Sequence, residues 1–367
     1  MSKKITVGIF FGGRSAEHEV SLQSAKSIVE AIDKDKFELV LVGIDKNGKW
    51  YLCENHDFLN NSSDPKRISI RKTQDELALV PGMNDHQLLI IHKNEYLKKL
   101  DVVFPVLHGP YGEDGTMQGL LKLTNIPFVG PGVMGSSVSM DKDVMKRLLQ
   151  DSGIPNAAFL VYQLHEMPSI NFKDVESKLG LPVFIKPANM GSSVGVNKAN
   201  NEEEFYMGMK DAFQYDTKVV VEEFIKGREI ECAVLGNEDP QASIAGEIIA
   251  HHDFYSYKAK YIDEKGASLK IPAELSDDMM KKVQRIAIDT FKVLGCEGLG
   301  RVDMFVTSEN KIFVNEINTL PGFTKISMYP KLWDYSGLSY KDLITKLLEL
   351  ALARHQRDEK LKTEVAG

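Results

Sequence analysis

Two apolar, β-rich segments near the C-terminal end constrain this chain more than any other feature, because both carry regularly spaced polar residues. Residues 298–305 include Arg301 and Asp303, and residues 312–318 include Glu316 and Asn318. Side chains two apart on a strand point to the same face of a sheet. If the two segments pair as a hairpin, these four polar side chains converge on one surface. Because they are embedded among apolar residues, a binding site is favoured over a solvated hairpin face.

The residue types at this surface indicate metal and phosphate chemistry. Mg²⁺ prefers hard oxygen ligands, usually one or two carboxylates together with substrate phosphates. Asp303, Glu316 and Asn318 supply such a set. An arginine beside it suits charge that develops on a transferred phosphoryl group or a tetrahedral intermediate, which is the role predicted for Arg301.

Two further segments have features of a nucleotide site. Lys186 is followed by a loop of small residues, 187–195, whose glycines and serines would let backbone N–H groups and hydroxyls approach phosphates. Its spacing does not match a Walker A loop, and a surface hairpin is the alternative interpretation. The apolar strand 218–224 ends in Glu222 and Glu223, with Glu229 beyond it. This strand end suits an adenine with its ribose, or is simply a capped strand end.

The first part of the chain predicts an open α/β sheet. Residues 5–11 form a strand pattern broken by two glycines, residues 15–32 have helical periodicity, and residues 37–44 and 101–107 are further strands. Glu17 lies at the first strand-to-helix turn, where it either serves the site or complements the helix dipole. His108 follows the third strand and has the same two interpretations. A third glycine of a dinucleotide fingerprint is missing, which disfavours a dehydrogenase.

The remaining pattern predicts a second module after a break at residues 153–155. We expect helices at 140–151, 277–294 and 340–354, and strands at 181–186, 231–235 and 244–249. Residues 253–261 are aromatic and basic, which is typical of a lid that closes over phosphates. Contact with nucleic acid is the alternative, but the chain shows no other such patch.

Composition limits the class of protein. With 367 residues, the chain exceeds the size of one hydrophobic core, so two or three domains with a cleft between them are expected. The net charge of −7 argues against a general nucleic-acid binder. The three cysteines form no C-x-x-C pair, which predicts reduced thiols in a cytoplasmic protein. We expect no membrane-spanning segment.

Taken in order, these motifs resemble the ATP-grasp superfamily and, within it, the D-alanine:D-alanine ligase family. The resemblance runs from residues 12–21 to residues 318–324. It implies an α/β (α+β) fold with a three-domain ATP-grasp architecture, in which two α+β modules sandwich ATP. The implied domains are an N-terminal substrate-binding domain (1–139), a central ATP-grasp subdomain (140–226), and a C-terminal domain with lid and metal site (227–367).

The resemblance also implies roles for individual residues in nucleotide and metal binding. Two Mg²⁺ or Mn²⁺ ions would be held by Asp303, Glu316 and Asn318. The residues expected to contact the phosphates, adenine or ribose of ATP are Lys142, Lys186, Ser193, Glu222, Glu223, Ile225, Glu229 and Lys260.

For the amino-acid substrates, the family implies two D-alanine subsites. Glu17, hydrogen-bonded with Ser192 and Tyr261, would hold the ammonium of the first D-alanine, with His108 nearby. The residues expected to bind the second D-alanine and the reaction's oxyanion are Ser327, Met328, Arg301 and the backbone N–H of Gly322.

The implied activity is ligation of two D-alanines through an acyl phosphate, which supplies the peptidoglycan precursor, by a cytoplasmic homodimer without nucleic-acid or membrane partners. Tyr261 favours a dipeptide over a depsipeptide product. Met328 replaces the commoner leucine, so a D-alanine:D-lactate, D-alanine:D-serine or other ATP-grasp ligase remains an alternative. A nucleotide-binding regulatory module is disfavoured because Asp303, Glu316 and Asn318 are all present.

Overall fold

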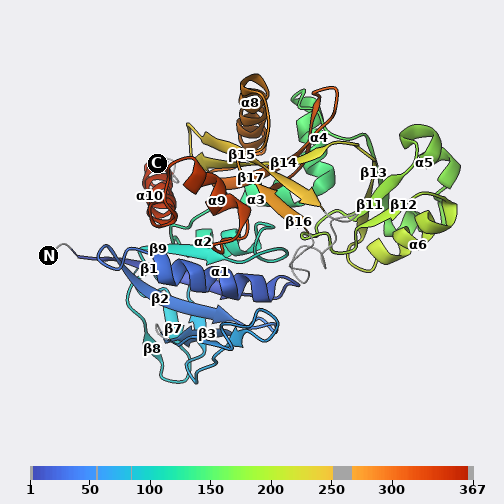
Figure 1. The fold of residues 1–367 in the computed structure, drawn as a ribbon. Helices are drawn as coiled ribbons and strands as arrows, with labels where there is room; N and C mark the ends of the chain where they lie inside the picture. The colour runs from blue at the N-terminus through green and yellow to red at the C-terminus, as the bar shows by residue number, and fades with distance from the viewer. Residues whose placement is uncertain (1–2, 55–56, 84, 251–266, 363–367) are drawn as a thin grey trace.

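The structure of the chain is a computed structural model that describes residues 3–54, 57–83, 85–250 and 267–362. The expected lid at residues 253–261, with Lys260 and Tyr261, lies outside the described residues. Three main sheets are arranged around the middle of the molecule (Figure 1). The N-terminal sheet lies at the lower left of this view, the central sheet at the right, and the C-terminal sheet below α8 at the top.

The N-terminal sheet has the strand order β3-β2-β1-β9. The strands β1 (Ile5–Gly12), β2 (Phe37–Ile44) and β9 (Val102–Val106) are parallel, and β3 (Trp50–Cys53) is antiparallel at the edge. The predicted strand-turn-helix unit is confirmed by β1 and α1 (His18–Ala31). Gly12 has a φ of 94°, and a Cβ there would lie 2.2 Å from the Ile44 carbonyl oxygen. Only glycine therefore fits where the chain turns toward α1.

Residues 59–96 add two small sheets, which the sequence did not predict. One pairs β4 (Leu59–Asn60) with β5 (Ser69–Ile70), and the other has the order β6 (Leu77–Leu79), β7 (Leu88–Ile90), β8 (Glu95–Tyr96). Three helices then follow β9, namely α2 (Thr116–Leu123), α3 (Val133–Met140) and α4 (Lys142–Asp151).

The central sheet is antiparallel, with the order β10-β13-β11-β12. Its strands are β10 (Phe159–Gln163), β11 (Val183–Pro187), β12 (Asn197–Ala199) and β13 (Lys218–Glu223). A 3-10 helix, η1 (Leu164–Ser169), follows β10. The helices α5 (Phe172–Leu179) and α6 (Glu202–Ala212) pack against the sheet through buried residues such as Val175 and Phe205.

The C-terminal sheet is also antiparallel, with the order β16-β15-β14-β17-β18. The strands are β14 (Arg228–Gly236), β15 (Gln241–Ala250), β16 (Ala267–Lys270), β17 (Gly298–Val306) and β18 (Ile312–Asn318). Along β14, Cys232 and Val234 belong to the core under α8 (Asp277–Val293), whereas Ala233 and Leu235 belong to the core under α9 (Met328–Tyr335). Because neighbouring side chains of a strand point to opposite faces, the two helices cover opposite faces of this sheet.

The last helix, α10 (Tyr340–Asp358), packs against the N-terminal sheet. Its buried residues Leu343, Leu347 and Leu348 belong to the same core as Val7 of β1 and Val102 of β9. A continuous hydrophobic core therefore joins the C-terminal sheet to the N-terminal sheet.

The predicted strands and helices correspond to observed elements, and the last helix continues four residues beyond the predicted end at 354, to Asp358. The helices α2, α3, α5, α6 and α9 were not predicted. The domain limits 1–139, 140–226 and 227–367 each enclose one main sheet and stay a prediction. Within the described ranges, no helix is long and apolar enough to cross a membrane.

Candidate active site

The strands β17 and β18 form the predicted hairpin, and its register aligns the polar residues. Arg301 lies opposite Asn318, and Asp303 lies opposite Glu316. The Arg301 guanidinium donates two hydrogen bonds to the Asp303 carboxylate, both of 2.7 Å, and the Asn318 amide donates a third of 3.0 Å. The structure therefore brings these four residues together, as the alternating sequence pattern predicted.

Arg301 lies among the carboxylates of this hairpin and of the neighbouring strand. Glu231, on the neighbouring strand β14, places a carboxylate oxygen 3.0 Å from Arg301 Nε. Burial opposes the charge on Arg301, but Asp303, Glu231 and Glu316 outweigh this effect and hold its pKa well above the ordinary value. One arginine thus contacts two carboxylates, and the Lys142 Nζ lies 3.9 Å from the Glu316 carboxylate.

This donor set fits a magnesium site that depends on substrate phosphates for part of its coordination. It offers two carboxylates and one amide from adjacent strands. No group of three or more histidine, cysteine, aspartate or glutamate side chains suited to hold a metal occurs in the described part of the chain.

Lys142 connects the hairpin with the loop that follows β11. It is buried at the start of α4, and its ammonium donates a 2.6 Å hydrogen bond to the Met190 carbonyl oxygen. Burial lowers the pKa of Lys142, although the charge of Glu316 opposes this shift. The three predicted parts of the nucleotide site, Lys142, the 187–195 loop and Glu316, therefore meet at one place.

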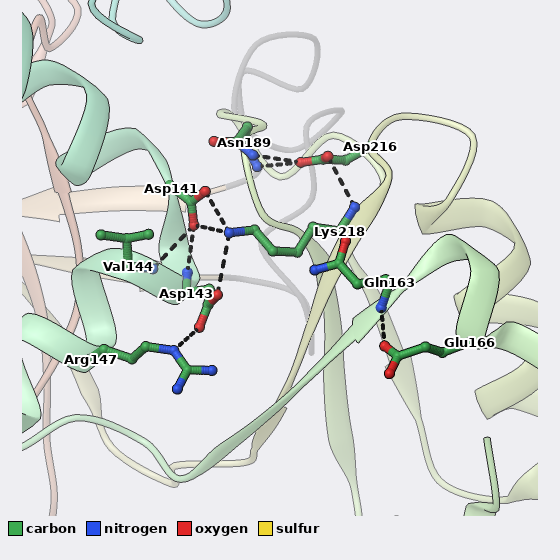
Figure 2. Close-up of polar contacts among 9 residues, drawn as sticks. All are labelled: Asp141, Asp143, Val144, Arg147, Gln163, Glu166, Asn189, Asp216 and Lys218. Carbon is green, nitrogen blue, oxygen red and sulfur yellow. Dashed lines mark hydrogen bonds and ion pairs between the residues drawn. The ribbon is translucent and has the colours of Figure 1, made fainter. Parts of the chain in front are cut away.

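The N-terminus of α4 is tied to the central sheet (Figure 2). The ammonium of Lys218, on β13, lies 2.7 Å from Asp141 and 3.3 Å from Asp143. Asp141 also caps α4 by accepting two backbone N–H bonds of 3.1 Å. At the start of the small-residue loop, Asn189 donates its backbone N–H and its side-chain amide to Asp216. These contacts fix Lys142 relative to the loop.

Glu222 lies between two lysines, one of which the sequence interpretation missed. Lys186 donates a 2.8 Å hydrogen bond to one carboxylate oxygen, and the Lys146 ammonium lies 3.3 Å from the other. Burial favours the neutral acid, but the two lysines outweigh it and lower the pKa of Glu222 to about 2. Lys146 is fully buried, one helical turn after Lys142, and that i, i+4 spacing was the signal available in the sequence.

The other predicted nucleotide contacts lie around the end of β13. The Glu223 carboxylate accepts a 2.7 Å hydrogen bond from the Ala158 backbone N–H, so both glutamates at this strand end have protein partners. Ile225 follows the strand and is half-buried, and Glu229 lies on β14. Ser193 has a φ of 58° in the small-residue loop.

Glu17, which precedes α1, contacts the small-residue loop of the central part of the chain. The Ser192 hydroxyl donates a short hydrogen bond to the Glu17 carboxylate. Space for that carboxylate depends on glycines, because a Cβ on Gly109 would lie 2.5 Å from its Oε2 atom and one on Gly191 would lie 3.1 Å from it. The structure thus brings together Glu17 and Ser192, and their predicted partner Tyr261 is not described.

His108 is buried beside this group. Its Nδ1 lies 2.8 Å from the Leu320 carbonyl oxygen, which can only accept, so Nδ1 carries the proton. Its Nε2 then accepts from the Ser24 hydroxyl, 3.2 Å away. Burial lowers the pKa of His108, with Glu17 and the Leu320 carbonyl opposing that shift. Both ring nitrogens are therefore engaged within the protein.

Glu113 is a buried carboxylate that the sequence interpretation missed. Its two oxygens accept backbone N–H bonds from Gly109, at 2.6 Å, and from Leu320, at 3.0 Å. Burial and the charge of Glu17 raise its pKa to about 8. Glu113 lines a small cavity of about 20 Å³ together with Lys142, Glu316 and Asn318.

The predicted second-substrate residues lie just after the hairpin. Ser327 precedes α9, and its hydroxyl accepts the Thr324 backbone N–H at 3.1 Å. A Cβ on Gly322 would lie 3.2 Å from that hydroxyl oxygen. The Met328 side chain is buried against β15, close to Gly246. Gly322 and Ser327 are therefore neighbours, whereas the Met328 side chain points into the core.

Comparisons with known proteins agree over nearly the whole chain. The family model described as D-ala D-ala ligase N-terminus matches residues 6–131, and D-ala D-ala ligase C-terminus matches residues 148–349. A D-alanine–D-alanine ligase of Oceanobacillus iheyensis is 58% identical over 363 residues, covering 99% of each chain. D-alanine–D-alanine ligase A of Escherichia coli is 55% identical over 361 residues, covering 98% of this chain and 99% of the relative.

Solved structures of ligases are also similar to this chain over nearly its whole length. The D-alanine-D-alanine ligase from Coxiella burnetii superimposes with a TM-score of 0.85 at 39% identity, covering 98% of this chain and 97% of the other. A D-Ala:D-Ser ligase from Enterococcus faecalis gives a TM-score of 0.84 at 36% identity, covering 95% and 100%.

Proposed function

The chain belongs to the D-alanine–D-alanine ligase family, and from this membership we propose how its residues divide the reaction. The protein has the ATP-grasp fold and uses ATP to join two D-alanines into the dipeptide needed for peptidoglycan. One contact carries the assignment of the nucleotide side. Lys142 lies between the Met190 carbonyl of the small-residue loop and the Glu316 carboxylate of the hairpin.

In the first half of the reaction, the carboxylate of one D-alanine attacks the γ-phosphate of ATP, giving an acyl phosphate and ADP. Lys142 and Lys186 are the cations that hold the phosphates in line with the attacking oxygen. Two Mg²⁺ or Mn²⁺ ions on Asp303, Glu316 and Asn318 would neutralise the phosphoryl oxygens. The register of β17 and β18, which brings the oxygen-bearing side chains of Asp303, Glu316 and Asn318 together, supports this assignment.

In the second half, the amine of the second D-alanine, once deprotonated, attacks the acyl carbon and phosphate leaves. Glu17 holds the ammonium of the first D-alanine, and Ser192 orients the Glu17 carboxylate. Arg301 and the Gly322 N–H stabilise the oxyanion that forms on the acyl carbon. Ser327 and Met328 hold the carboxylate of the second D-alanine. Met328 does so through its backbone, because its side chain is buried.

Adenine and ribose are assigned to the end of β13, with Ile225 and Glu229. Because the side chains of Glu222 and Glu223 already have protein partners, their part in adenine binding is assigned to the backbone of the strand end. Ser193, Lys260 and Tyr261 keep the roles that the family implies, on the phosphates and the first substrate. D-Serine or D-lactate as second substrate is the competing proposal, and one structural neighbour is a D-Ala:D-Ser ligase.

Two further proposals rest on family membership. We assign the protein to the cytoplasm, in agreement with three buried free cysteines among the described residues, and we expect a homodimer. Size-exclusion chromatography with light scattering tests the dimer, which a purely monomeric protein would contradict.

The metal assignment is tested by Glu316→Gln, with phosphate release from Mg-ATP as the readout. Glu316→Gln keeps the side-chain shape but removes the charge, so turnover should fall by about 100-fold or more while the fold is retained. Glu309→Gln is the matched control, because Glu309 is exposed in the turn of the same hairpin and forms an ion pair with Lys311. Near-normal activity of Glu316→Gln would remove the two-metal proposal.

A further inference from the structure

Residues 320–323 connect the hairpin to the second-substrate residues, and their backbone is held at both ends. At Leu320, the N–H donates to Glu113 at 3.0 Å and the carbonyl accepts from His108 at 2.8 Å. At Phe323, the N–H donates to the Ser24 hydroxyl at 3.1 Å and the carbonyl accepts from the Tyr340 hydroxyl. Both backbone groups of each end residue are therefore fixed by side chains.

Gly322 lies between these fixed ends. The N–H groups of Leu320 and Phe323 are used in the contacts above, and Pro321 has no N–H. The Gly322 N–H is therefore the remaining backbone donor of residues 320–323. In the part of the chain that the structure describes, the Gly322 N–H has no hydrogen-bond acceptor. The segment is thus arranged so that this donor is available to a ligand.

Three of the four holding side chains come from the N-terminal part of the chain. Ser24 lies on α1, and His108 and Glu113 lie in the loop after β9, more than 200 residues from Leu320 in the sequence. All three side chains are buried, and Glu113 is the acidic one among them. Its second oxygen accepts the Gly109 N–H, so both oxygens are occupied by backbone donors. Burial raises the pKa of this carboxyl group to about 8, and the two backbone donors replace part of the hydration that it loses.

We propose that Glu113 is a positioning residue for peptide-bond formation: by holding the Leu320 N–H, it places the Gly322 N–H at the acyl oxygen and residues 324–328 at the second D-alanine. This inference rests on the proposed role of Gly322. The N-terminal sheet and its loops would accordingly control the second half of the reaction as well as the binding of the first substrate. Formation of the acyl phosphate, which depends on Lys142, Lys186 and the hairpin carboxylates, does not require this contact.

The two half-reactions can be separated by isotope exchange within ATP. Reversible acyl phosphate formation scrambles a labelled oxygen between the β,γ-bridge and the nonbridging positions of the β-phosphate, whereas dipeptide formation removes the acyl phosphate irreversibly. If Glu113→Ala displaces Gly322, the acyl phosphate reverts more often, and the ratio of exchange to dipeptide formation should rise about tenfold or more. Partial unfolding would lower both rates and leave the ratio unchanged.

Asp114→Ala is the matched control, because Asp114 lies in the same loop and also accepts two backbone N–H bonds, from Tyr111 and Thr116, but none from residues 320–323. Its ratio should equal that of the unchanged protein. Ser24→Ala is a second variant, which removes the acceptor of the Phe323 N–H and the hydroxyl bonded to His108 but no carboxyl group, and it should also raise the ratio.

An unchanged ratio in both Glu113→Ala and Ser24→Ala, or an equal rise in Asp114→Ala, would overturn the inference. Absence of D-alanine-dependent exchange and dipeptide in the unchanged protein would instead contradict the proposed function. The two failures are therefore distinguishable.

Discussion

At the scale of single residues, the Lys146–Glu222–Lys186 group shows how a buried charge supports a nucleotide site. Lys146 and Glu222 are inaccessible or nearly so, and Lys186 also donates to the Asn315 side chain, next to Glu316. The position of Lys186 is thus set by Glu222, whose other oxygen is set by Lys146. Removing either partner of a buried ion pair leaves an uncompensated charge.

We predict that Glu222→Gln lowers the free energy of unfolding by about 3–5 kcal/mol, because two lysines lose their shared counter-charge. Urea denaturation followed by circular dichroism measures this. Glu309→Gln, which breaks an exposed pair with Lys311, should leave the urea midpoint unchanged. Equal midpoints for the two variants would show that the buried group contributes nothing to stability.

The pH dependence of stability gives a second prediction for Glu222. Its pKa is about 2 in the folded chain and 4.5 in a free glutamate, so the unfolded chain binds more protons between these values. The stability that Glu222 contributes is fully present above about pH 4.5 and is lost as the pH falls toward 2. As the pH is lowered across this range, the thermal unfolding temperature should fall more steeply for the unchanged chain than for Glu222→Gln. Parallel curves would contradict the assignment.

At the scale of elements, the tight turn after β9 determines where Glu17 can lie. Gly109→Ala would place a methyl group 2.5 Å from the Glu17 carboxylate at a φ of 72°. We predict a rise of about tenfold or more in the KM of the first D-alanine, because the carboxylate that receives its ammonium must move.

The control for this change is Gly82→Ala, which has a similar φ of 79° but open space around the new methyl group. It carries the same backbone strain without the steric conflict, so its KM should not change. Steady-state kinetics with D-alanine as the varied substrate compares the two variants. An unchanged KM in Gly109→Ala would remove Glu17 from the first subsite.

Local patterns in the sequence predicted elements and residues whose partners are close along the chain, whereas the grouping of Glu17 with Ser192, 175 residues apart, came from the family resemblance. The alternation in residues 298–305 and 312–318 was enough to align Arg301, Asp303, Glu316 and Asn318, because a hairpin brings neighbouring strands together. Glu113 and Lys146 were missed, since their partners Leu320 and Glu222 are 207 and 76 residues away, and only the folded chain shows that they meet. The short strands between residues 59 and 96 have too few residues to show a period.

At the scale of the whole molecule, the N-terminal sheet and the C-terminal helices share one core. Leu347 of α10 is buried in the same cluster as Val7 and Val102. We predict that Leu347→Ala lowers the free energy of unfolding by about 2–5 kcal/mol. Because the core is continuous, near-ultraviolet circular dichroism and inactivation should show the same shift in the urea midpoint. Inactivation at an unchanged midpoint, while the spectrum shifts, would mean that the two sheets unfold independently.

The most direct test of the proposed reaction is a parallel measurement of ADP and dipeptide with Mg-ATP and D-alanine as the sole amino acid. L-alanine, D-serine and D-lactate are then supplied singly and paired with D-alanine. The proposed division of the site predicts one ADP for each D-alanyl-D-alanine formed, and no turnover with L-alanine alone. ADP formation without the dipeptide, or a preference for D-serine or D-lactate as the second substrate, would contradict it.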